Sequence, residues 1–178
     1  MIDLETLSLE HNAVIASIAA VEFGNETTDR EFHIKVDVED CEKYGMHISA
    51  STVVFWMGQD RSVQTELTSS GRYSLASALE QFSEWLTIDG LIEEFSIWAL
   101  GDKDVPWLEN AYKVTDIPIP WHYRNVYNYR VLNRFSIQED YPPSNDMSHQ
   151  SLADCRWQIK FVQNFCKRNK LNLEEVFG

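Results

Sequence analysis

The chain has 178 residues, of which 44% are hydrophobic and 24% are charged, a composition typical of a folded globular protein rather than a disordered one. Its 28 acidic residues outnumber its 15 basic residues, so the formal net charge is −13. This charge argues against a protein that coats duplex DNA or an anionic membrane, because both ligands require a basic surface. The length suits one domain, and the sequence has no repeat or linker, so we expect a single domain over residues 1–178.

The first part of the sequence carries strand patterns. Residues 1–5 are typical of the end of a short strand, and the nearly continuous apolar run of residues 13–23 predicts a strand buried on both faces. Residues 31–38 alternate between apolar and polar side chains, which predicts a half-buried strand that forms an antiparallel hairpin with residues 13–23. The apolar side of this strand consists of Phe32, Ile34, Val36 and Val38.

Helices alternate with strands in the rest of the chain. The apolar spacing predicts helices over residues 74–86 and 151–168, and residues 94–100 predict a strand. Residues 104–112 predict a short helix with Asp104 as its cap, and Ser151 with Asp154 resembles a capping box. Residues 51–57 suit either a strand or a helix. The expected fold class is therefore α/β, with a mixed β-sheet flanked by α-helices.

The cysteines and the hydropathy indicate where the protein works. The three cysteines, Cys41, Cys155 and Cys166, lack any CxxC spacing, which predicts reduced, buried thiols rather than a zinc site. No run of residues is apolar enough to span a membrane, and the first residues lack the basic region of a signal peptide. We therefore expect a cytoplasmic protein with no membrane partner.

Three groups of residues could carry chemistry, although each one alone has an ordinary structural explanation. Asp3 and Glu5 lie two apart on a strand, so both carboxylates project from one face, where hard divalent cations find oxygen ligands. His149 precedes the last helix, and Asp154 lies in its first turn. Asp104 lies in the connection between a strand and a helix, where α/β sheets often bind ligands.

In this order and on these elements, the three groups resemble the motifs of the DEDDh 3′→5′ exonucleases, a branch of the ribonuclease-H-like fold. Asp3 and Glu5 match the first motif, Asp104 the second, and His149 with Asp154 the third. Within this superfamily the chain is similar to the group that includes the T-even phage exonuclease DexA and a mycobacterial exoribonuclease. The matching stretches are residues 2–7, 12–15, 17–23, 52–56 with Gln59, 98–101, 104–112, 120–125 and 149–155. The resemblance also favours a helix at residues 52–59.

The resemblance implies a mechanism and a set of roles. Two divalent ions, Mg²⁺ or Mn²⁺, would be held by Asp3, Glu5, Asp104 and Asp154, and together they would stabilise the attacking and leaving oxygens of a phosphodiester. The general base for the attacking water would be His149. The substrate would be the 3′ end of single-stranded DNA or RNA, and the protein could form a homodimer. By the same analogy Thr6 and Leu7 would contact the terminal nucleotide, and Trp56 would either stack on a base or belong to the core.

Some positions depart from the family pattern and leave other functions open. Lys103 replaces the usual aromatic residue, Tyr127 and Asn128 replace an Arg-Asp pair, and only two residues precede Asp3. One alternative is a catalytically weak or inactive ribonuclease-H-like module that binds nucleic acid or protein. A second alternative is an acidic protein that mimics DNA, a function that would not require His149. If the exonuclease hypothesis holds, the charge of −13 predicts weak binding with strong metal dependence and shallow salt dependence.

Overall fold

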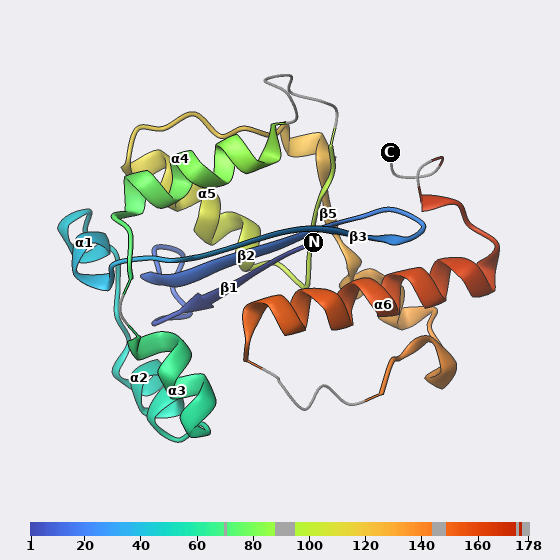
Figure 1. The fold of residues 1–178 in the computed structure, drawn as a ribbon, viewed down its shortest axis with the longest axis horizontal. Helices are drawn as coiled ribbons and strands as arrows, with labels where there is room; N and C mark the ends of the chain where they lie inside the picture. The colour runs from blue at the N-terminus through green and yellow to red at the C-terminus, as the bar shows by residue number, and fades with distance from the viewer. Residues whose placement is uncertain (70, 88–94, 144–148, 174, 176–178) are drawn as a thin grey trace.

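The computed structural model has an α/β architecture in which helices cover both faces of two neighbouring sheets, a three-stranded antiparallel sheet and a two-stranded parallel sheet. Figure 1 shows the helices on the two sides of the strands. Strands β1 (Ile2–Thr6), β2 (Ile15–Phe23) and β3 (Thr27–Lys35) are antiparallel, with β2 in the middle. Strands β4 (Ile97–Ala99) and β5 (Val126–Asn128) pair in parallel, and β4 lies beside β1. The structure describes residues 1–69, 71–87, 95–143, 149–173 and 175.

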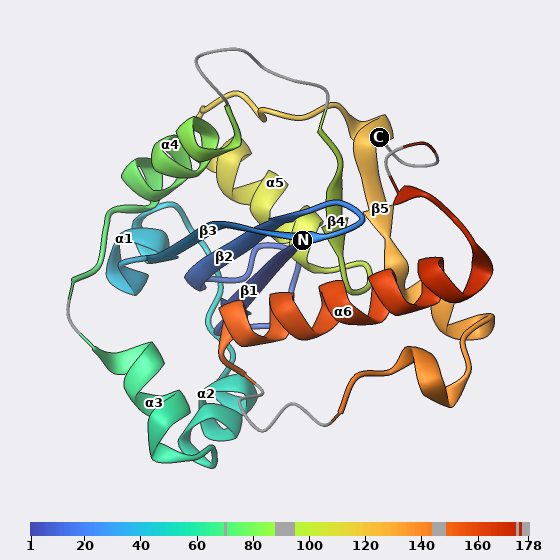
Figure 2. The same cartoon turned by 45° about the vertical axis from the view of Figure 1, so that its right-hand side comes forward.

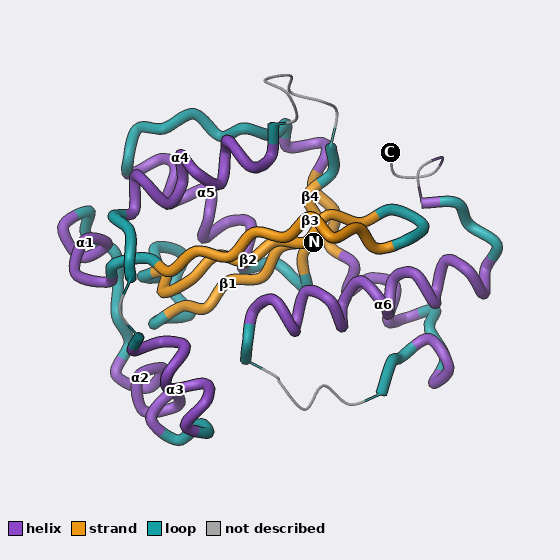
Figure 3. Tube along the Cα trace, in the orientation of Figure 1, coloured by secondary structure: helices purple, strands orange, loops and turns teal. Residues whose placement is uncertain are grey.

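The helices form a layer on each face of the sheet and a separate pair at one end. Helices α4 and α5 cover one face, and α6 crosses the other (Figure 2). Helices α2 and α3 pack together beyond the end of the sheet at which β1 finishes (Figure 3). The helices are α1 (Val38–Lys43), α2 (Ala50–Met57), α3 (Arg61–Thr68), α4 (Leu75–Leu86), α5 (Asp104–Val114) and α6 (Ser151–Asn169). Three short 3₁₀ helices follow α5: η1 (Tyr123–Asn125), η2 (Tyr129–Arg134) and η3 (Gln138–Asp140).

The sheet separates two hydrophobic clusters, one on each face. Ile2 and Leu4 of β1 belong to the cluster that contains the apolar faces of α4 and α5. Because successive side chains of a strand point to opposite faces, Asp3 and Glu5 point toward the side covered by α6. That side is packed by buried α6 residues such as Cys155. Strand alternation therefore brings the β1 carboxylates toward the last helix.

Most of the predicted elements are confirmed. The predicted α/β fold class with flanking helices is confirmed, and β2 is buried along most of its length and pairs with β3 in the predicted hairpin. Helix α4 begins after Ser74, whose hydroxyl accepts a hydrogen bond from the Ser77 N–H. Residues 51–57 are helical, as the family resemblance favoured. The three cysteines are free and buried, as predicted. Among the described residues, no helix is long and apolar enough to cross a membrane.

Four details of the sequence prediction differ from the structure. Val38 does not extend β3, because the Asp37 carboxylate accepts a hydrogen bond from the Glu39 N–H and starts α1 there. Asp104 is the first residue of α5 rather than its cap. Ser151 does not form a capping box with Asp154, because the cap position of α6 falls one residue earlier, at Gln150. The predicted strand over residues 94–100 is shorter, at 97–99, and Glu94 lies outside the described residues.

Candidate active site

The β1 carboxylates meet the N-terminal turn of α6. Asp3, Glu5 and Asp154 each offer a carboxylate oxygen, and these three oxygens all lie within 4.8 Å of one another. We call these three residues the acidic cluster. On the neighbouring strand β2, the residues opposite Asp3 and Glu5 are the small Ala19 and Ser17, which leave room for α6 to approach this face.

The fourth predicted ligand, Asp104, lies next to the acidic cluster but outside it. Asp104 is buried at the start of α5, where its carboxylate accepts hydrogen bonds from the Leu4 N–H and from its own N–H. Its charge acts on Asp3, and the Arg130 guanidinium acts on Asp104. The structure thus places all four predicted carboxylates in one region, with three of them in mutual contact range and the fourth bonded to β1.

Burial and repulsion between carboxylates favour protonation in this region. The pKa of Asp3 is raised well above its usual value, first by burial and then by the charges of Asp104, Glu5 and Asp154. The Gln158 amide opposes this shift in part by donating a hydrogen bond of 2.9 Å to Asp3 Oδ1. Burial also raises the pKa of Asp104 to about 6, despite its backbone hydrogen bonds and the charge of Arg130. A bound cation would reverse the balance, because it favours ionised carboxylates.

The predicted general base, His149, lies directly before α6 with its backbone in the left-handed region, at φ 64°. Its N–H donates a 2.8 Å hydrogen bond to Asp154 Oδ2, which joins the histidine to the acidic cluster. Its ring packs edge-on against Phe55 and Trp56 of α2, with centroid distances of 5.3 and 5.7 Å. Segments far apart in the sequence therefore hold the imidazole in place.

The predicted substrate contacts, Thr6 and Leu7, lie where β1 ends. The Thr6 hydroxyl donates to the Ser8 carbonyl, and the Thr6 carbonyl accepts a hydrogen bond from Trp56 Nε1. The Leu7 N–H donates to Val14, and the Leu7 carbonyl accepts from the Ser49 N–H. Both backbone groups of Leu7 are thus used within the protein, and its half-buried side chain packs against the core cluster. Trp56 is buried and anchors α2, as the core interpretation predicts.

Buried polar atoms with no hydrogen-bond partner gather around the acidic cluster. Among the described residues they include the hydroxyls of Ser17 and Ser151, the Tyr129 hydroxyl and Gln158 Oε1. Such atoms are rare inside proteins unless a water molecule or an ion belongs beside them. Oxygen donors of this kind suit a hard divalent cation with its water ligands, so the residues of the site fit Mg²⁺ or Mn²⁺.

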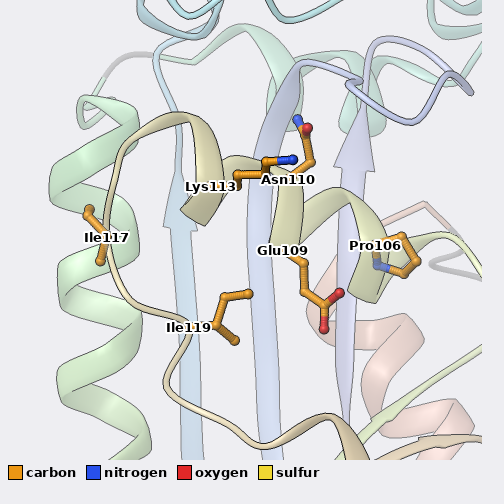
Figure 4. Close-up of a pocket in the computed structure, with 6 residues that line it drawn as sticks. All are labelled: Pro106, Glu109, Asn110, Lys113, Ile117 and Ile119. Atoms are coloured by element: carbon orange, nitrogen blue, oxygen red, sulfur yellow. The ribbon is translucent and has the colours of Figure 1, made fainter.

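A separate open pocket lies on the outer side of α5, between this helix and the segment that follows it (Figure 4). None of the predicted site residues lines it, so it adds nothing to the site described above. Its lining residues are Pro106, Glu109, Asn110, Lys113, Ile117 and Ile119.

The motif search missed Gln158, Tyr129 and Arg130. Helical spacing could have identified Gln158 from the sequence, because it lies four residues after Asp154 and hence on the same face of α6. No local pattern marks Tyr129 or Arg130, because they reach the site only through the pairing of β4 with β5.

An α/β fold with clustered carboxylates where its first strand meets its last helix is consistent with a ribonuclease-H-like exonuclease domain. The family model described as 3'-5' exoribonuclease Rv2179c-like domain matches residues 1–166, so the chain belongs to this Rv2179c-like family. It is thereby a member of a 3′-5′ exonuclease family. No curated protein matches the chain.

Proposed function

We propose that the protein is a metal-dependent DEDDh exonuclease that removes nucleotides from the 3′ end of single-stranded DNA or RNA by phosphodiester hydrolysis, like the group that includes phage DexA. The observation that carries this proposal is the convergence of Asp3, Glu5 and Asp154, with His149 bonded to Asp154. A module that only bound nucleic acid would have no need for a histidine fixed beside clustered carboxylates.

The acidic cluster and Asp104 are the residues that would hold two divalent ions. When bound, these ions supply charge stabilisation at the attacking and leaving oxygens of the phosphodiester. Asp3 is oriented by the Gln158 amide, and Asp104 by the Leu4 N–H, so both carboxylates are positioned before any ligand arrives.

His149 supplies the proton transfer in this proposal. Neutral imidazole accepts a proton from the attacking water, whose oxygen forms a bond to phosphorus while the bond between phosphorus and the 3′ oxygen of the preceding nucleotide breaks. The 3′ oxygen leaves with the electron pair of that bond and takes a proton from solvent. Phe55 and Trp56 pack edge-on against the ring and support it from the side of α2. The Leu7 side chain, half-buried at the end of β1, would contact the terminal base.

RNA is the first substrate to test, because the family is described as an exoribonuclease domain. Matched RNA and DNA strands with a 5′ label are incubated with Mg²⁺ or Mn²⁺, and stepwise shortening from the 3′ end is expected. EDTA abolishes the ladder. Asp3→Ala and His149→Ala lower the rate by at least roughly 100-fold, in keeping with the loss of a metal ligand or a general base.

Two exposed residues of the same types serve as matched controls. Asp60→Ala and His33→Ala keep the wild-type rate, because both residues are exposed and neither belongs to the site. If no substrate yields a ladder with either metal, the proposed exonuclease activity is refuted. In that case, retained binding of the strand would support the alternative of an inactive nucleic-acid-binding module. The observation in favour of this alternative is that Asp104 lies outside the acidic cluster.

A further inference from the structure

A stretch free of acidic residues stands out in this acidic chain. Residues 117–138 contain three arginines and no Asp or Glu, although the whole chain carries a net charge of −13. Two of these arginines lie on η2, directly after β5. Five consecutive or nearly consecutive side chains there are exposed, and we call four of them, Arg130, Val131, Arg134 and Phe135, the η2 surface; the fifth is Asn133.

The η2 surface begins at the candidate active site. Arg130 packs against Gly101, the residue in the turn between β4 and α5, so closely that a Cβ at Gly101 would lie 2.7 Å from Arg130 Nη2. Asn128 Oδ1 accepts hydrogen bonds from both the Gly101 N–H and the Arg130 N–H, which ties the two segments together. From this position the charge of Arg130 acts on Asp104.

The far end of the η2 surface is anchored to the opposite end of α6. Arg168, in the last turn of α6, donates a 3.1 Å hydrogen bond to the Phe135 carbonyl. The same guanidinium forms two hydrogen bonds of 2.7 Å with the buried Asp140 carboxylate. The Phe135 side chain nevertheless is 69% exposed. The surface therefore runs from Asp104 along α6 on a backbone that is already ordered, which lowers the entropy cost of binding.

From this arrangement we propose that the η2 surface binds the single strand on the 5′ side of the bond to be cleaved. The inference rests on the proposed exonuclease function and extends it to a second part of the substrate. Arg130 and Arg134 contact backbone phosphates, and neither has a carboxylate within salt-bridge distance among the described residues. Phe135 offers a face on which a base stacks, an interaction that tolerates any sequence.

The chain provides a matched control at the other end of β5. Tyr123 and Arg124 are an exposed aromatic residue and an exposed arginine next to each other, as Arg134 and Phe135 are, and Tyr123 is also 69% exposed. They precede β5, whereas the η2 surface follows it, so a strand leaving the acidic cluster along η2 does not reach them. If the loss of any exposed arginine weakened strand binding, substitution of Tyr123 and Arg124 would weaken it as much as substitution of Arg134 and Phe135.

The test compares long and short substrates. For each variant, kcat/KM is measured on a labelled strand of about 20 nucleotides and on a dinucleotide, and the ratio of the two values is recorded. We expect Arg134→Ala/Phe135→Ala to lower this ratio roughly fivefold or more, since each lost phosphate or stacking contact weakens binding of the longer strand. Arg134→Lys, which keeps the charge, restores most of the ratio when Phe135 is retained. Tyr123→Ala/Arg124→Ala keeps the wild-type ratio.

Strand binding supplies a second readout that does not depend on turnover. In the Asp3→Asn background, Arg134→Ala/Phe135→Ala weakens binding of the labelled strand and reduces the slope of log affinity against log salt by about 0.7, the value for one phosphate contact on a single strand. A wild-type ratio together with wild-type binding in this variant, or equal losses in the control pair, would overturn the inference while leaving the exonuclease intact. Wild-type protein that degrades neither substrate would instead refute the proposed function, and the binding measurement would still decide the role of the η2 surface.

Discussion

Two buried acidic regions of this protein are stabilised in opposite ways. Asp140 accepts two hydrogen bonds from Arg168 and one from the Ile137 N–H, and these contacts hold the pKa of Asp140 below its usual value. Asp3, in the acidic cluster, accepts its hydrogen bond from the neutral amide of Gln158, and burial with three neighbouring carboxylates raises its pKa. One carboxylate has a cation supplied by the fold, and the other is surrounded by negative charge.

This difference separates a structural role from a functional one. An ion pair within the chain holds η3 and the end of η2 against α6, and it needs no ligand. Clustered carboxylates destabilise the fold when they are ionised and become favourable only with a cation from outside. The position of each group agrees with this reading, since Asp140 lies near the far end of α6 and Asp154 at its beginning.

The largest expected effect is that of a divalent ion on the thermal stability of the protein. At a Mg²⁺ or Mn²⁺ concentration about 100 times the dissociation constant, binding to the folded state contributes about 2.7 kcal/mol, or roughly 5–10 °C in Tm. Asp3→Asn loses most of this gain, whereas Arg168→Met retains it. Melting curves with EDTA and with added metal measure the difference. An equal gain in Asp3→Asn would show that the ion binds somewhere else.

A smaller effect is expected from breaking the Asp140 ion pair. Arg168→Met removes the charge-assisted hydrogen bonds of a partly exposed guanidinium and lowers Tm by roughly 3–6 °C, with or without Mg²⁺. Lys167→Met, the exposed neighbour in the same turn of α6, is the matched control and leaves Tm within about 1 °C. If both variants melt alike, the ion pair does not stabilise the fold as the comparison requires.

The smallest effect concerns pH in the absence of metal. Because the pKa of Asp104 is about 6 in the fold and 3.8 in its usual state, the folded protein binds the proton more tightly. Ionised Asp104 lowers the free energy of unfolding by its full amount above pH 6, and this loss of stability declines as pH falls toward 3.8. Between pH 7 and pH 5, wild type should gain about 1.4 kcal/mol relative to Asp104→Asn, or roughly 3–5 °C.

The comparison with Asp104→Asn is needed because another group opposes this trend. Burial lowers the pKa of the Met1 amino group to about 6, so this amine costs stability as pH falls from 8 to 6. Both proteins share that group, and its contribution cancels in the difference between their melting temperatures. A difference in Tm that stays constant from pH 7 to pH 5 in EDTA would contradict the raised pKa of Asp104.

Local patterns were sufficient for the elements and for part of the site. A two-residue spacing on a strand required Asp3 and Glu5 to share a face, and the apolar stripe of α6 required Cys155 and Ile159 to face the sheet. The turn at Asp37 was missed, because a short polar residue that starts a helix directly after a strand resembles a continuation of the strand pattern.

Contacts between distant segments could not be predicted in this way. Arg130 reaches Gly101 because β4 and β5 pair in parallel and Gly101 adopts φ 94°, a backbone conformation that the sequence permits without requiring. Likewise, the packing of His149 against Phe55 and Trp56 depends on where α2 docks.

The sequence by itself determined the charge of −13, the α/β class and the order of the acidic motifs, because composition and periodicity are properties of the chain. Only the tertiary structure decided which of the acidic side chains would repel one another and which would be neutralised. Burial and the distance between charges set that outcome, and both arise when α6 packs on the sheet. The net charge of −13 is therefore unevenly distributed, since three carboxylates gather in the acidic cluster whereas residues 117–138 carry three arginines and no Asp or Glu.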